Sequence, residues 1–87
     1  MTNYYVALDS RSHAFLLERR MKSEGIECEI SFVLRAVMNA IWNMGVKFGE
    51  SVLDRAINLL RYCGLPGVRL YREIVTPSGY IYSEVQI

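Results

Sequence analysis

The segment NYYVALDSRSHAFLLERRMKSEG, residues 3–25, predicts a strand that runs directly into a helix. Its first six residues, Asn3–Leu8, form an apolar, β-prone run, and the small polar side chains that follow are typical of a helix N-terminus. Apolar residues then recur at helical spacing as far as Met21, and Gly25 occupies the place where a left-handed residue commonly ends a helix. We therefore expect a strand at 3–8 and a helix that ends at Gly25.

The next part of the chain predicts a second strand, a short helix and a third strand. Residues 26–32 alternate apolar and polar side chains, as in a strand that buries one face, so that Cys28 is expected in the core. Residues 34–44 carry apolar side chains at helical spacing, and residues 45–48 can form a short strand.

A second long helix is expected at residues 51–63. Ser51 and Asp54 imitate a capping box at its start, and Gly64 with Pro66 closes it. Beyond it, two β-prone runs at 68–75 and 80–85 are joined by the turn residues 76–79, which is the pattern of a hairpin.

The order β-α-β-(short α)-β-α-β-β predicts an α+β protein of the ferredoxin-like sandwich type. Its helices should cover one face of a mainly antiparallel sheet. The length of 87 residues suits a single domain over residues 1–87, with 67–87 as a C-terminal strand and hairpin extension.

Composition narrows the classes of function. Hydrophobic residues make up 52% of the chain, which predicts that some apolar surface is buried against a larger protein or a second copy. Ten basic against nine acidic residues argue against a nucleic-acid binder with a broad basic face. No apolar run approaches the roughly 20 residues of a membrane span, and we expect a cytoplasmic protein without a membrane partner.

No catalytic, metal or cofactor site is expected from the residue types. The two cysteines, Cys28 and Cys63, do not form a Cys-x-x-Cys pair, and one histidine cannot complete a zinc site. His13 has no partner that would define a triad, and Glu27 with Glu29 is better explained as a pair of solvated carboxylates. The chain is therefore expected not to be an enzyme.

Six residues are candidates for contact with a partner. Trp and Arg are favoured at binding hot spots, the hairpin tyrosines offer aromatic surface, and the final strand presents an edge for pairing with another chain. The plain alternative is that the tryptophan packs in the core, the cations are solvated and the tyrosines pack across the strands. The candidates are Arg35, Trp42, Met44, Lys47, Tyr80 and Tyr82.

Two other functional hypotheses depend on residues in the C-terminal part of the chain. Cys63 precedes a glycine-rich turn that can expose its thiol, although the helix C-terminus disfavours a thiolate and a packing role is the alternative. Tyr71, Tyr80 and Tyr82 offer a stacking surface for single-stranded nucleic acid, but the hairpin lacks the basic and glycine-bearing signature of an RNA-binding strand.

A set of short features resembles a family of small prokaryotic proteins described as selenium/sulfur carrier-like. The resemblance covers residues 4–60 and implies handling of sulfur or selenium on a cysteine. It is carried by Tyr5–Leu8, Ser12–Ala14, Glu18 with Lys22, Gly25 with Ile26, Arg35, and Val46–Phe48.

The family pattern places a proline, an arginine and the carrier cysteine where this chain has Leu34, Arg35 and Trp42. An aromatic in place of a thiol turns a chemical site into a hydrophobic anchor. The sequence therefore predicts a small non-catalytic accessory protein that binds a larger protein or self-associates. The alternative is a sulfur or selenium carrier with Cys63 as the persulfide-bearing thiol.

Overall fold

The computed structural model describes residues 2–32 and 44–87. The predicted short helix at 34–44 lies outside these residues, apart from Met44, which begins a strand. The elements in chain order are β1 (Thr2–Ala7), α1 (Arg11–Ser23), β2 (Glu29–Phe32), β3 (Met44–Gly49), the 3₁₀ turn η1 (Glu50–Val52), α3 (Leu53–Cys63), β4 (Arg69–Thr76) and β5 (Gly79–Val85).

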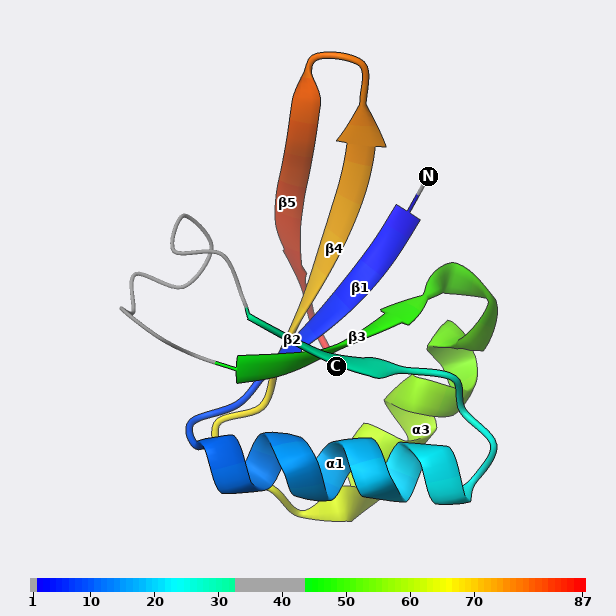
Figure 1. Ribbon diagram of the computed structural model, residues 1–87, viewed down its shortest axis with the longest axis vertical. Helices are drawn as coiled ribbons and strands as arrows, with labels where there is room; N and C mark the ends of the chain where they lie inside the picture. Colours follow the sequence, from blue (N-terminus) through cyan, green and yellow to red (C-terminus); the bar gives the residue numbers. More distant parts are fainter. Residues whose placement is uncertain (1, 33–43) are drawn as a thin grey trace.

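Within the described parts of the chain, five strands form one sheet in the order β2-β3-β1-β4-β5, and every neighbouring pair is antiparallel. Both helices of the described residues lie on the same side of this sheet, as Figure 1 shows. The predicted α+β architecture of ferredoxin-like type is confirmed, and β5 continues the sheet beyond β4.

The core lies between the sheet and the two helices, and β1 supplies its centre. Tyr4 and Val6 alternate toward the helices, as the period of a strand requires. Each helix contributes residues from one face at spacings of three and four, as expected for amphipathic helices packed on a sheet. These helical core residues are Ala14, Leu17 and Met21 of α1, and Ala56, Leu59 and Leu60 of α3.

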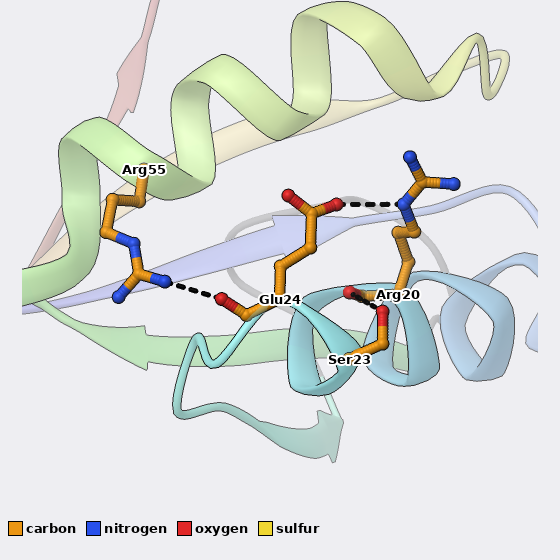
Figure 2. A network of polar contacts seen from close by, with 4 residues as sticks. All are labelled: Arg20, Ser23, Glu24 and Arg55. Carbon is orange, nitrogen blue, oxygen red and sulfur yellow. Dashed lines mark hydrogen bonds and ion pairs between the residues drawn. The ribbon is translucent and has the colours of Figure 1, made fainter.

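The end of α1 is tied to α3 by a small polar network, shown in Figure 2. Arg20 pairs with Glu24 at 2.9 Å, and the hydroxyl of Ser23 donates to the carbonyl oxygen of Arg20 at 2.7 Å. Arg55, from the first turn of α3, donates to the carbonyl oxygen of Glu24. A carbonyl that the helix leaves without a partner is thus satisfied by the neighbouring helix.

Two local expectations need correction. The capping box at Ser51 is wrong, because the chain leaves β3 in the turn η1, so that Ser51 lies inside this turn and α3 begins after it without a side-chain cap. The second strand begins at Glu29 instead of residue 26, since the backbone N–H of Ile26 donates to the carbonyl oxygen of Met21 at 2.9 Å and closes α1. The predicted end of the second helix is confirmed by Gly64, whose φ is 68°.

Adjacent leucines on α1 provide a test of this packing. Leu17 is 1% exposed and Leu16 is 52% exposed. We expect Leu17→Ala to lower the free energy of unfolding by about 2–4 kcal/mol through loss of buried surface and a residual cavity. The matched variant Leu16→Ala should change it by less than about 0.5 kcal/mol. Urea unfolding followed by circular dichroism measures both, and equal losses would contradict the assigned helix face.

Candidate partner-binding face

The sheet surface opposite the helices carries a cluster of aromatic and charged side chains. The strand register places Tyr5 opposite Lys47 on one side and opposite Tyr71 on the other, and Glu73 opposite Tyr82. These residues alternate with the core residues of the same strands, so they lie on the other face of the sheet. We call this surface the outer face; it consists of Asn3, Tyr5, Lys47, Tyr71, Glu73, Tyr80 and Tyr82.

Glu73 is the buried centre of the outer face. It is 3% exposed, and its two carboxylate oxygens accept hydrogen bonds from the Tyr82 hydroxyl at 2.6 Å and from the Asn3 amide at 3.1 Å. Burial raises the pKa of Glu73, but the hydrogen bonds from Tyr82, Asn3 and Tyr5, together with the charge of Lys47, outweigh burial and hold this pKa below its ordinary value. Glu73 is therefore a buried carboxylate that stays ionised and fixes the side chains around it.

Three tyrosines form a row that runs from the central strand to the sheet edge. The ring centres of Tyr5 and Tyr82 are 6.3 Å apart, and those of Tyr82 and Tyr80 are 6.4 Å apart. The ammonium nitrogen of Lys47 lies 5.6 Å from the centre of the Tyr5 ring, which is within the range of a cation–π contact. The row ends at Tyr80, which is 62% exposed.

The phenols of Tyr5 and Tyr82 remain protonated at neutral pH. Burial, followed by the charge of Glu73, raises the pKa of Tyr5 to about 12. Burial and the hydrogen bond to Glu73 raise the pKa of Tyr82 as well. Tyr5 and Tyr82 therefore act as neutral donors and aromatic surface and supply no phenolate for chemistry.

The charges of this sheet face are mixed. Besides Lys47 and Glu73, the register places Arg69 of β4, Glu29 of β2 and Glu84 of β5 on the same side as Tyr5. Among the described residues of this face, two cations against three carboxylates leave no basic surface. Within residues 2–32 and 44–87, no group of three or more His, Cys, Asp or Glu side chains is placed to hold a metal ion.

The structure brings together three of the six predicted contact residues. Lys47, Tyr80 and Tyr82 share the outer face: Tyr5 contacts Lys47 and Tyr82, and Tyr80 contacts Tyr82. Met44 is half-buried and packs against the core on the helix side. Arg35 and Trp42 lie outside the described residues, so their contact with a partner stays a prediction.

Sequence reasoning missed Asn3, Tyr5 and Glu73. The signal was present as an alternation, because odd-numbered residues of β1 and β4 face one way and even-numbered residues face the other. An apolar run such as Tyr4–Leu8 hides this alternation, since tyrosine serves equally well in a core and on an exposed face.

Neither thiol is placed as an open nucleophile. Cys28 is half-buried against the core, as expected, and burial followed by nearby Glu18 raises the pKa of its thiol more than Lys22 lowers it. The Cys63 thiol is also half-buried and donates to the carbonyl oxygen of Leu60 at 3.3 Å.

An open pocket adjoins Cys28 at the place where β2 separates from β3. Its lining includes Glu27, Glu29, Lys47 and Ser51. Two carboxylates beside one ammonium group give it no excess of positive charge for an anion.

Among the described residues, no helix is both long and apolar enough to cross a bilayer.

The contribution of the hydrogen bond from Tyr82 to Glu73 to the stability of the fold depends on pH. Because the folded-state pKa of Glu73 lies below its ordinary value of 4.5, its ionisation stabilises the fold above that value, and this stabilisation is lost as pH falls through the folded-state pKa. We expect Tyr82→Phe to cost about 1.5–3 kcal/mol at pH 7 and clearly less at pH 3. Tyr80→Phe is the control and should cost less than about 0.5 kcal/mol at either pH. Urea unfolding at the two pH values measures this, and a pH-independent loss in Tyr82→Phe would contradict the assignment.

Comparison with known proteins places the chain in a family. The model of the family described as "Putative Se/S carrier protein-like" matches residues 3–72, which extends past the expected end at Leu60 to the middle of β4. No curated protein and no solved structure matches the chain. The family match covers most of the sequence and ends before β5, and the chain belongs to this Se/S carrier-like family.

Proposed function

We propose that this protein is a non-catalytic, cytoplasmic accessory protein that binds a larger protein through the outer face. The observation that supports this most strongly is the tyrosine row from Tyr5 to the exposed Tyr80, held around the ionised Glu73. Tyrosine is enriched at protein interfaces because it combines a large apolar ring with a hydrogen-bonding tip.

The rigidity of the outer face favours binding. Tyr82 is held by its hydrogen bond to Glu73, and Tyr5 is held between Lys47 and Tyr82. Side chains that are already ordered lose less conformational entropy when a partner binds. No described helix or strand packs over this face, so the ordered aromatic surface is offered to another molecule.

The charge pattern favours a protein partner over nucleic acid. A single-stranded nucleic acid needs cations along its phosphates as well as aromatic stacking surfaces. The sheet face that carries the tyrosine row has Lys47 and Arg69 against Glu29, Glu73 and Glu84. A phosphate backbone laid over these residues would meet more carboxylates than cations.

Site-specific photo-crosslinking in the native cell tests this proposal. A benzophenone amino acid in place of Tyr80 is expected to yield a covalent adduct with one larger protein. The control places the same probe at Tyr62, which is 86% exposed but lies on α3, away from the outer face. Equal yields at both positions, or an adduct at position 80 with a second copy only, would contradict the larger-partner proposal.

Sulfur or selenium carriage is the second candidate function, and the family match is the observation that favours it. In this case Cys63, at the end of α3, would bear the extra atom as a persulfide or its selenium analogue. The half-buried position and the hydrogen bond to Leu60 restrict attack by this thiol.

Thiol reactivity separates the two candidate functions. We expect Cys63 to react with a thiol probe at neutral pH no faster than free cysteine, and Cys28 to react more slowly because burial raises the pKa of its thiol. Cys63→Ser and Cys28→Ser serve as matched controls that assign the signal. A Cys63 thiol faster than free cysteine, carrying a reductant-labile sulfur or selenium atom in the native protein, would support the carrier function instead.

A further inference from the structure

The last strand of the sheet presents an open edge. β5 pairs with β4 over its full length, from Gly79 opposite Thr76 to Val85 opposite Leu70. It is the terminal strand of the sheet order, and no other described strand pairs with it. Backbone N–H and C=O groups that point away from β4 are therefore available for pairing with another chain.

This edge lacks the usual protection against pairing. The sequence of β5, GYIYSEV, contains one charged residue, Glu84, and no lysine or proline. Tyr80 is 62% exposed and Ile81 is 55% exposed. The opposite edge of the sheet, β2, has four residues against seven in β5, and a short edge strand gives little ladder for another chain.

The hairpin is also accessible from both sides. Figure 1 shows that its turn end, between β4 and β5, projects beyond α1 and α3. Tyr80 lies on the outer face, and Ile81, opposite Ile74, lies on the side of the helices. A strand that docks here can therefore bury apolar side chains on both sides of the sheet.

We propose that the β5 edge pairs with β5 of a second copy of this chain, antiparallel and centred on Tyr82. This register uses all seven residues of the strand. It places Tyr80 opposite Glu84 and Ile81 opposite Ser83 of the other copy, and it joins the two sheets into one continuous sheet. The two-fold axis through Tyr82 makes the interface self-complementary, as closed homodimers require.

The charges of β5 favour this occupant. In the centred antiparallel register each Glu84 faces a tyrosine hydroxyl, which donates to a carboxylate, and this occurs twice by symmetry. The two Glu84 side chains are four strand positions apart, about 13 Å at a rise of about 3.3 Å per residue. A parallel, in-register pair would set Glu84 directly against Glu84. The pairing uses the strand edge and does not depend on the partner proposed for the outer face.

Sedimentation equilibrium of the full chain over a range of concentrations tests this proposal. We expect the wild-type mass to approach twice the 10.0 kDa of one chain. Ile81→Lys places a cation at the centre of the interface in both copies, and it is expected to weaken association at least about tenfold. The control Ile87→Lys makes the same exchange at another exposed isoleucine, beyond the end of β5, and should leave association unchanged. Circular dichroism checks that both variants are folded.

A wild-type chain that stays monomeric at all concentrations would overturn the proposal, and so would equal association of the two lysine variants. Such a failure is distinct from failure of the proposed function. A monomer that still forms the crosslink from position 80 to a larger protein would leave the outer-face proposal intact.

Discussion

The pairing of β1 on both sides is the constraint on which the rest of the structure depends. β3 and β4 both add to this strand, so its register sets theirs and, through them, the positions of β2 and β5. Successive side chains of β1 then point to opposite faces of the sheet, the core face and the outer face. Tyr4 and Val6 are held in the core beneath the helices, and Asn3 and Tyr5 are presented on the opposite side.

Glu73 contributes to the stability of the fold and also orders the side chains of the proposed binding surface. A carboxylate with so little exposure is tolerated only because hydrogen-bond donors replace its water, and here the donors are outer-face side chains. The same bonds that keep Glu73 ionised hold the Tyr82 ring in place beside Tyr5 and Tyr80. The order of this aromatic surface is thus a consequence of how the sheet satisfies one buried charge.

Much of the fold follows from the sequence, because hydrophobic periodicity and glycine positions are local signals. Such local signals predicted the strand and helix within residues 3–25 and the end of α3 at Gly64. The predicted start of α3 was wrong because the chain forms a 3₁₀ turn directly after β3, in place of the side-chain cap expected at Ser51. Sequence alone does not reveal such a turn, since it depends on where the preceding strand ends.

The candidate site was only partly predictable. Lys47, Tyr80 and Tyr82 were identified by residue type, but Tyr5, which contacts Lys47 and Tyr82, comes from a strand more than forty positions earlier in the chain than either of them. Strand order and register, which sequence patterns leave open, bring them together. The contribution of Arg35 and Trp42 remains a prediction from the sequence.

Native mass spectrometry of the untagged protein, purified from its own cells with and without reductant, tests the central claim most directly. Binding through the outer face predicts a complex with a larger protein that persists in reductant. A chain recovered without any protein partner, carrying a sulfur or selenium atom that reductant removes, would contradict this account and identify the protein as a carrier.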